Sequence, residues 1–506
     1  MPPQTDARLT AAIALTRFGL GAGAGEIDTV ARDPRGWLEG QILTGGAANP
    51  AGEFETSPAR VQAFLNYQRD SQTARQARRE APADRARMTD AAMSMRADAA
   101  ADPQAQAVFD ARRESRRDLV QDTAREFLAR AQLGATTEAG FAERWALFWA
   151  NAFTVSATKF QAAVFIGQYE REAIRPHVFG RFEDLAVAAE THPAMLLYLD
   201  QAQSIGPNSR AGARRQAGLN ENLAREILEL HTVGADGGYS QADVTEFARA
   251  LTGWSLPTNR DGGGLQRTGT GGARRRAVEA ALAGEAGENG FVFRAVVHEP
   301  GARTVLGKSY AEGAAGQGEA ILRDLANRPE TARRLARNLA RHFVADEPPA
   351  SLVDRLETAW TGSRGDLAQV AKALITAPEA WDPRPAKIKT PYEFVVSSHR
   401  ALGTRPQRVQ LLQQALVQMG QPAFSAPSPE GWPDTAADWA GPDALVKRLN
   451  WAKTVGDTAQ AGDPNAVAAG ALGSRLSERS RLAVARAESR PEALTLFLMS
   501  PEFQRR

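Results

Sequence analysis

The sequence predicts a large, mostly α-helical protein with a small β-hairpin insertion. Apolar residues recur at helical spacing along most of the chain, for example at Val244, Phe247 and Leu251. Segments in which apolar and polar residues alternate, the pattern of a half-buried strand, are scarce. The clearest β signal is a pair of short apolar runs within residues 291–308. We therefore expect helices packed on helices, with strands confined to one small element.

The composition is that of a soluble globular protein. Hydrophobic residues make up 43% of the 506 residues and charged residues 24%. A net charge of only +2 argues against a general nucleic-acid-binding protein, which needs a basic face. The absence of cysteine excludes disulfides, thiolate nucleophiles and zinc–thiolate sites. The length exceeds that of one compact unit, so roughly two or three subdomains are expected.

Shifts in composition divide the chain into four regions. These are an N-terminal helical segment (1–68), an Arg/Ala-rich helical pair (69–135), a main helical body (136–405) with a hairpin at 289–310, and a C-terminal helical region (406–506) with a Pro-rich loop at 422–442. The first residues lack a basic stretch followed by an apolar core, so no signal peptide is predicted and a cytoplasmic location is expected. No apolar run approaches the roughly 18 residues of a membrane span.

The Arg-rich segment has nearly balanced charges. Residues 69–130 hold 13 Arg, no Lys and 11 Asp plus Glu. Most of these charges stand at helical spacings, which favours an exposed helix pair with ion pairs along it over a nucleic-acid-binding arm. A break near Asp102-Pro103 should separate the two helices, because proline disfavours helix both at its own position and before it.

Two loops and one turn interrupt the helical pattern. Glu299-Pro300-Gly301-Ala302 is a good turn between the two apolar runs and predicts a hairpin there. Residues 260–276 are Gly-rich and indicate an exposed loop. Residues 422–442 contain too much proline for a helix and predict a long ordered loop over the surface.

Residues 220–240 hold the densest group of side chains that could take part in catalysis or bind a metal. On a helix, Asn222, Glu226 and Glu229 form one polar stripe, and Arg225 can pair with carboxylates four residues away. One interpretation is the solvated, ion-paired side of an amphipathic helix. The other is a close carboxylate pair that holds a cation or shares a proton as an acid/base couple.

The neighbouring His231 stands two residues after Glu229, so an uninterrupted helix would turn their side chains apart. The segment after it resembles a calcium loop only in its second half, because the two opening carboxylates are missing. A helix start with Ser240 as the N-cap and Asp243 three residues later fits better. The six histidines are widely scattered and no zinc spacing is present, so no metal site is predicted.

Further polar candidates lie elsewhere in the chain. His298 stands at the expected hairpin turn and Lys308 follows it, where either could face a ligand. Asn151 flanks an aromatic-rich patch that is most simply core. Trp432 lies on the Pro-rich loop, where a ring either stacks on a ligand or pins the loop to the core. Because no phosphate-binding or dinucleotide fingerprint stands in a suitable context, no particular cofactor is predicted.

Several phrases together resemble one family. They include ERWALFWANAFTVSATK (143–159), HPAMLLYLDQAQSIGPNS (192–209), NENLAREILELHTVGADGGYSQADVTEFARALTGW (220–254), KIKTPYEFVVSSHRALG (387–403) and GWPDTAADW from residue 431. The chain is similar in these phrases to a bacterial family catalogued as domain of unknown function 1800. The resemblance covers nearly the whole chain and implies no established biochemical role.

The resemblance implies a partner protein, and at one position this chain departs from the family's usual pattern. Members often accompany a sulfatase-like family exported by the twin-arginine route, which makes a periplasmic location by co-export the alternative to the cytoplasm. Where relatives usually read Trp-x-Asn-His-Phe, this chain carries Ala152 in place of the histidine. If that histidine were catalytic in relatives, this protein would be impaired or specialised.

Two hypotheses of function follow. The first is a hydrolase-like enzyme acting on a polymer, with Glu226, Glu229, His231 and His298 as catalytic residues. Its substrate would be bound by Asn151, Asn222, Arg225, Lys308 and Trp432. The second is a non-catalytic partner or maturation factor for a secreted sulfatase-like protein. An enzyme predicts the glutamates in a pocket with a histidine, whereas a partner protein predicts an open helix face and an apolar patch elsewhere.

Overall fold

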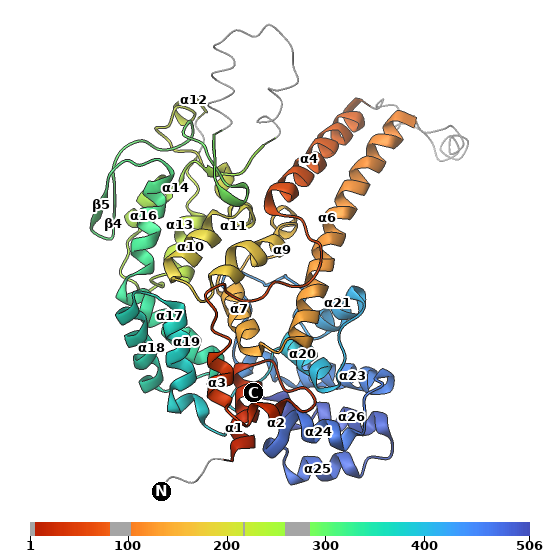
Figure 1. Cartoon of the computed structure of the whole chain (residues 1–506). Helices are drawn as coiled ribbons and strands as arrows, with labels where there is room; N and C mark the ends of the chain where they lie inside the picture. The colour runs from red at the N-terminus through yellow and green to blue at the C-terminus, as the bar shows by residue number, and fades with distance from the viewer. Residues whose placement is uncertain (1–5, 81–102, 216–217, 259–283) are drawn as a thin grey trace.

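A computed structural model describes residues 6–80, 103–215, 218–258 and 284–506 (Figure 1). The Gly-rich loop predicted at 260–276 and part of the Arg/Ala-rich segment lie outside these residues. Within them the protein is mostly helical with small antiparallel sheets, so the predicted fold class is confirmed. None of the described helices is long and apolar enough to cross a membrane.

The described chain begins with short helices and then forms a long helix pair. The first elements are α1 (Ala7–Ile13), η1 (Ala14–Phe18), α2 (Glu26–Val30) and α3 (Pro34–Glu39). The long helices α4 (Ser57–Glu80) and α6 (Pro103–Thr136) pack side by side and project from the body (Figure 1). The predicted break at Asp102-Pro103 is where α6 begins.

The main body is a layered set of short helices around an aromatic core. In order these are α7 (Gly140–Ala152), α8 (Phe160–Ala163), α9 (Ile166–Tyr169), η3 (Glu170–Ile174), η4 (Arg175–His177), α10 (Phe182–Thr191), α11 (Pro193–Tyr198), η5 (Gln201–Gln203), α12 (Gly212–Arg215), α13 (Asn222–Glu226), η6 (Ile227–His231) and α14 (Gln241–Leu251). Trp145 and Trp149 of α7 are fully buried at its centre, where Phe179 stacks on Trp145 with ring centroids 6.0 Å apart. The predicted cap of α14 is confirmed, because Ser240 and Asp243 form a capping box.

In the part of the chain that the structure describes, five short strands make two small sheets. The first contains β1 (Trp254–Ser255), β2 (Glu285–Ala286) and β3 (Val292–Phe293) in the order β1-β3-β2. The second is the hairpin of β4 (Arg303–Val305) and β5 (Lys308–Tyr310). All neighbouring strands are antiparallel.

The pairing predicted across residues 299–302 is wrong. The two apolar runs on either side of that turn belong to different sheets, because β3 pairs with β1 and β2 while β4 pairs with β5. The hairpin turns instead at Leu306 and Gly307, both of which have positive φ. Two-residue hairpin turns favour such left-handed residues because their twist matches that of the strands.

The remaining helices complete the body and build a second core. They are α16 (Ala315–Ala326), α17 (Pro329–Phe343), α18 (Ala350–Ser363), α19 (Leu367–Thr376), α20 (Pro391–Ala401), α21 (Val409–Gln418), α22 (Ala436–Trp439), α23 (Pro442–Thr458), α24 (Pro464–Leu472), α25 (Glu478–Ala485), α26 (Arg490–Leu498) and α27 (Pro501–Gln504), with short 3₁₀ turns η7 (Glu288–Gly290), η8 (Pro378–Trp381) and η9 (Gly473–Arg475). Buried residues of α20, α21 and α23 to α27 form a hydrophobic cluster together with Leu20 and with Phe127 and Ala131 of α6. The helix α6 therefore joins the C-terminal helices to the main body.

Candidate functional site

The acidic ridge (Asn222, Glu226 and Glu229) lies on α13 and η6. Asn222 is exposed, and the two glutamates are half-buried. Arg225 lies 3.1 Å from a carboxylate oxygen of Glu221 and 3.6 Å from one of Glu229, so the expected ion pairs four residues apart are present. None of these residues lines either of the two cavities described below. This arrangement is that of an ion-paired helix face.

His231 turns from the ridge into the core, because η6 is a wider π turn that ends at this residue. Its Nδ1 lies 2.6 Å from an oxygen of Glu190, and both side chains are fully buried, but the two groups form no hydrogen bond. The ring of Phe153 packs against the imidazole with centroids 5.0 Å apart. Burial raises the pKa of Glu226, and the nearby His231 opposes this rise.

His298 is buried rather than exposed at a hairpin tip. The residue is 8% exposed, and its Nδ1 lies 2.7 Å from the carbonyl oxygen of Thr252. Its ring packs edge-on against Phe293 of β3. Burial lowers the pKa of His298, so the neutral imidazole is favoured. The predicted place of His298 at a hairpin turn was wrong, because the strands pair differently: residues 295–298 form a turn packed against the end of α14.

Lys308 lies at the start of β5 and points outward. Its side chain is 61% exposed and forms an ion pair with Asp324 of α16. The ammonium also lies 5.3 Å from the centroid of the Tyr310 ring. The cation is therefore already engaged on an open surface.

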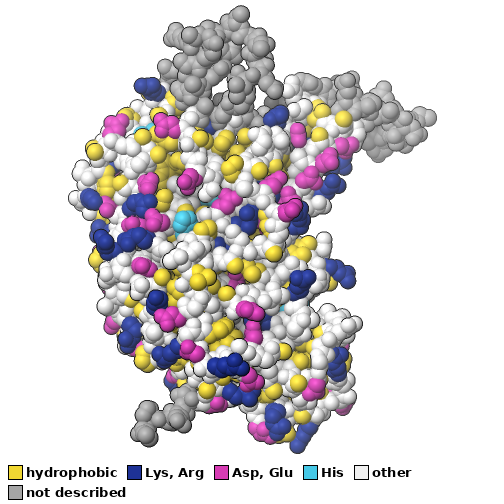
Figure 2. Space-filling model, in the orientation of Figure 1, with side chains coloured by type: hydrophobic (Ala, Val, Ile, Leu, Met, Phe, Trp, Pro, Cys, Tyr) yellow, Lys and Arg dark blue, Asp and Glu magenta, His cyan; other side chains and the backbone are white. Residues whose placement is uncertain are grey.

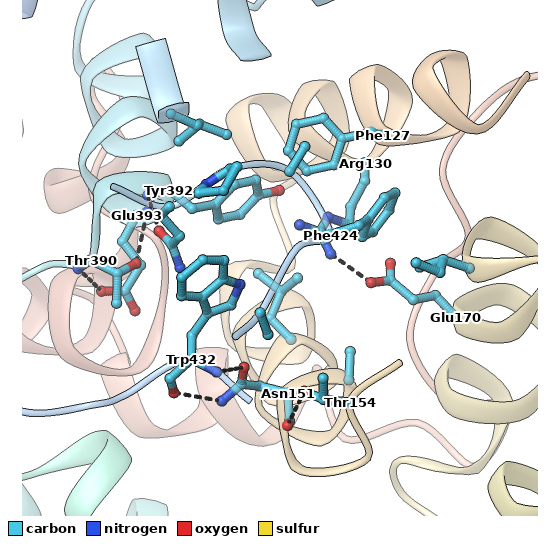
Figure 3. A pocket seen from close by; sticks show the side chains of 18 of the residues that line it. Phe127, Arg130, Asn151, Thr154, Glu170, Thr390, Tyr392, Glu393, Phe424 and Trp432 are labelled. Carbon is cyan, nitrogen blue, oxygen red and sulfur yellow. Dashed lines mark hydrogen bonds and ion pairs between the residues drawn. The ribbon is translucent and has the colours of Figure 1, made fainter. Parts of the chain in front are cut away.

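Asn151 and Trp432, which were predicted separately, meet in one cavity of about 130 Å³. This Trp432 cavity lies between α6, α7, α9, η3, α17, α20, α21 and the loop that follows α21 (Figure 3). Its wall includes the polar residues Arg130, Arg144, Asn151, Thr154, Glu170, His342, Thr390, Glu393, Gln421 and Asp434, and the rings of Phe127, Tyr169, Tyr392, Phe424 and Trp432. Elements from both hydrophobic cores thus contribute to the same cavity.

The amide of Asn151 holds the Pro-rich loop in place. Its Nδ2 donates to the carbonyl oxygen of Trp432 at 3.0 Å, and its Oδ1 accepts from the Trp432 backbone N–H at 2.8 Å (Figure 3). Gly431 before it has a φ of +90°, and a Cβ there would lie 2.6 Å from the carbonyl oxygen of Asn151. Only glycine therefore allows the loop to approach α7 this closely.

Arg130 of α6 lies in the cavity wall, where three aromatic rings surround its guanidinium group. Its guanidinium carbon lies 5.0 Å from the ring centroid of Phe127, 4.8 Å from that of Tyr392 and 4.7 Å from that of Phe424. One end of the guanidinium bonds a Glu170 oxygen at 2.5 Å, whereas its Nε has no partner among the described residues. The cation is fixed, and part of its hydrogen-bonding capacity is unused.

Tyr392, the second residue of α20, extends toward Arg130 (Figure 3). The residue is only 7% exposed, and its hydroxyl has no hydrogen-bond partner within the described part of the chain. Burial raises the pKa of Tyr392 to about 12, although Arg130 opposes this. The hydroxyl therefore stays protonated near neutral pH and is available as a donor. Buried polar groups without a partner are uncommon and point to a ligand or water.

His342 and Asp434 form a carboxylate–histidine pair at the cavity wall. His342 Nδ1 lies 3.0 Å from Asp434 Oδ2, and its Nε2 is buried without a partner among the described residues. Burial lowers the pKa of His342, although Asp434 opposes this. Burial alone would raise the pKa of Asp434, but His342, Arg506 and Lys387 together hold it below its usual value. Near neutral pH the pair is thus a neutral imidazole beside an ionised carboxylate.

Buried cations hold Asp434 and its neighbours in position. Lys387 Nζ lies 3.3 Å and Arg506 Nη2 3.5 Å from Asp434 Oδ1. Glu393 pairs with both Arg144 and Arg506, and these cations outweigh burial to hold its pKa well below the usual range. The network joins α7, α20 and the loop, so it makes the wall rigid.

A second cavity of about 270 Å³ lies beside Lys159 and Asp200. Lys159 Nζ donates to the carbonyl oxygen of Tyr198 at 3.2 Å and pairs with the Asp200 carboxylate. The rest of its wall mixes apolar residues such as Phe64 and Leu196 with the uncharged polar residues Gln68, Gln161, Gln203, Ser255 and Thr258. No buried polar side-chain atom of its described wall lacks a hydrogen-bond partner, whereas Arg130 Nε, the Tyr392 hydroxyl and His342 Nε2 lack one in the Trp432 cavity.

The sequence did not indicate most of the Trp432 cavity. The scattered histidines gave no reason to single out His342, and Arg130 belongs to the segment predicted to be an exposed helix pair. The available signal was Asp434, a carboxylate two residues after Trp432 on an irregular segment. Ala152 is half-buried against the main core and does not line the cavity, so the departure from the Trp-x-Asn-His-Phe pattern lies outside its wall.

Comparison with known proteins identifies a family but no activity. A family model described as "Protein of unknown function (DUF1800)" matches residues 13–505. No curated protein and no solved structure matches the chain.

Proposed function

Since the chain belongs to the DUF1800 family of proteins of unknown function, which names no reaction, we propose from its geometry that it is a hydrolase-like enzyme acting in the Trp432 cavity. The observation that carries this proposal is the His342–Asp434 pair. An ionised carboxylate bonded to Nδ1 fixes the tautomer in which Nε2 can accept a proton. The predicted carboxylate–histidine chemistry is thus assigned to these residues rather than to the acidic ridge.

The proposed reaction needs only water and a substrate with a scissile acyl or glycosidic bond. His342 Nε2 takes a proton from a water molecule as the water oxygen forms a bond to the electrophilic carbon. The imidazolium is stabilised by Asp434, and it then returns the proton to the leaving group as the old bond breaks. The fixed Asp434 keeps the ring oriented, because it is itself held by Lys387 and Arg506.

The size of the cavity restricts the substrate. A volume of about 130 Å³ is smaller than the usual small-molecule pocket of about 300–1,000 Å³. It accommodates a small molecule or one terminal unit of a polymer, not a continuous chain. The half-buried Asn151 and the Trp432 ring would contact that unit, as the sequence predicted for both residues.

Substitution of His342 tests this proposal. With a panel of p-nitrophenyl esters and glycosides, we expect His342→Gln to lower kcat by about 10²- to 10⁴-fold, the usual contribution of a general base. The matched control is His399→Gln, because His399 is also partly buried but bonds Thr404 and does not line the cavity. A folded His342→Gln protein with the wild-type rate, or a wild-type protein inactive on the whole panel, would refute the proposal.

The second candidate function is a non-catalytic partner of a sulfatase-like protein. It is favoured by Leu445, Val446 and Leu449, exposed neighbours on α23, because monomers rarely expose clustered apolar residues. On the face shown in Figure 2, acidic and basic side chains are interspersed and small apolar areas lie between them. Co-export with such a partner would place the protein in the periplasm.

Co-purification separates this candidate from the first. A tagged chain should capture the co-encoded sulfatase-like protein from the periplasmic fraction, and Leu449→Glu should abolish the capture. Glu226→Ala, on the ridge, is the control that should leave it unchanged. Equal capture by wild type and Leu449→Glu would exclude a partner surface on α23.

A further inference from the structure

The charged side chains in the wall of the Trp432 cavity restrict the net charge of a ligand that can bind there. Every charged Asp, Glu or Arg side chain of the described wall already has a partner of opposite charge. These pairs are Arg130–Glu170, Arg144–Glu393 and Asp434–Lys387. An additional charge placed among them would lose its hydration and find no free counter-ion, which is costly in a buried site.

Two donors in the described wall are unused, the Nε–H of Arg130 and the Tyr392 hydroxyl, and of these the hydroxyl is uncharged near neutral pH. The Tyr392 hydroxyl lacks a partner among the described residues, and the residue is more than nine-tenths buried. The tyrosine ring packs against Arg130 and Phe127, and the Phe127 ring centroid lies 6.1 Å from that of Tyr392. The hydroxyl is thus presented from a fixed ring, so it can select a ligand by the position of an acceptor oxygen.

We infer that the Trp432 cavity takes an uncharged ligand, part apolar and part carbonyl-like, whose oxygen accepts a hydrogen bond from Tyr392. The rings of Phe127, Phe424 and Trp432 contact its apolar part, and the hydroxyl fixes its polar end. This inference rests on the proposed function only in placing the ligand in the same cavity, since binding does not require His342 to act as a base.

Three probes of the same shape and different charge test the inference on the full-length protein. Benzamide is neutral, benzoate is an anion and benzamidine is a cation near neutral pH. In ligand-observed NMR titrations, we expect benzamide to bind at least about tenfold more tightly than either ion, because only the ions lose their hydration without gaining a counter-ion. Tighter or equal binding of benzoate or benzamidine, or no binding of benzamide, overturns the inference.

Tyr392→Phe locates the probe and keeps the ring packing. Loss of one hydrogen bond should weaken benzamide binding about three- to tenfold. Tyr310→Phe is the control, because its hydroxyl bonds Asp324 outside the cavity and its loss should leave binding unchanged. Equal affinity in Tyr392→Phe and wild type overturns the inference.

The two proposals fail separately. If benzamide binds through Tyr392 while His342→Gln hydrolyses the chromogenic panel at the wild-type rate, the reaction is wrong and the ligand class stands. If His342→Gln abolishes turnover while benzoate binds best, the reaction stands and the ligand class is wrong.

Discussion

At the scale of single residues, Asn151 shows why a side chain can be recognised as special without its role being known. The sequence placed it beside an aromatic core, and both a ligand contact and a bond to backbone were open. In the structure its amide pairs with both backbone groups of Trp432, as a neighbouring strand would. The partner lies 281 residues away, so no local pattern could name it.

The Asn151 pairing predicts a specific loss of stability. Asn151→Ala leaves two backbone groups of Trp432 without partners, and we expect the free energy of unfolding to fall by about 1–3 kcal/mol. Asn222→Ala is the control, since Asn222 is exposed and its loss should change stability by less than about 0.5 kcal/mol. Urea unfolding of both variants checks this. Equal stabilities for the two variants would show that the pairing contributes nothing.

Two glycines of the segment after α21 allow the cost of backbone strain to be measured separately from the cost of a steric clash. Gly420 and Gly431 have φ of +87° and +90°, but a Cβ would meet nothing within 4 Å at Gly420 and a carbonyl oxygen at 2.6 Å at Gly431. Gly420→Ala should therefore cost only the left-handed backbone strain, about 1 kcal/mol. Gly431→Ala should lower the free energy of unfolding by about 1–3 kcal/mol more, because its Cβ also pushes the loop away from α7.

The same unfolding titration measures both glycine variants. The expected order is wild type, then Gly420→Ala, then Gly431→Ala. A Gly431→Ala protein as stable as Gly420→Ala would mean that the loop moves away from Asn151 at no cost.

At the scale of elements, the sequence was most informative where structure is local. The capping box of α14 and the start of α6 at Pro103 follow from neighbouring residues, and both were predicted. The strand pairing was not, because β3 finds its partner in Trp254–Ser255, far back in the chain. The π turn η6 also escaped prediction, since a helix period of 3.6 residues was assumed up to His231.

At the scale of the whole molecule, buried histidines couple stability to pH. Burial lowers the pKa of His177, His192, His298, His342 and His399, the last to about 4. The unfolded chain binds protons at these sites near pH 6.5 and the folded chain does so only at lower pH. Stability is therefore fully present above pH 6.5 and falls as pH drops through the folded values.

Substitution of His399 tests at a single residue whether buried histidines cause the loss of stability at low pH. Its lowered pKa contributes up to about 3 kcal/mol of destabilisation between pH 6.5 and pH 4. His399→Gln should reduce the dependence of the unfolding free energy on pH by that order, as followed by urea titrations across this range. An unchanged pH dependence would show that His399 is protonated as readily in the folded protein as in the unfolded chain.

The candidate site is itself a property of the whole molecule. Residues of α6, α7, α9, η3, α17, α20, α21 and the loop after α21 form its wall, and buried ion pairs join α7, α20 and that loop. The residues of such a site lie far apart in the sequence and are brought together by long-range packing. A sequence pattern of closely spaced polar residues therefore pointed to the acidic ridge instead. Only Asn151 and Trp432 of the predicted residues line it.

The pH dependence of kcat/KM in wild type and Asp434→Asn tests the central claim most directly. Because burial lowers the pKa of His342 and Asp434 partly restores it, the acid limb of the wild-type profile should lie below pH 6.5. Removing the Asp434 charge should lower the rate and move that limb to still lower pH. An acid limb at or above pH 6.5, or one that Asp434→Asn leaves in place, would contradict the assignment of His342 as the base.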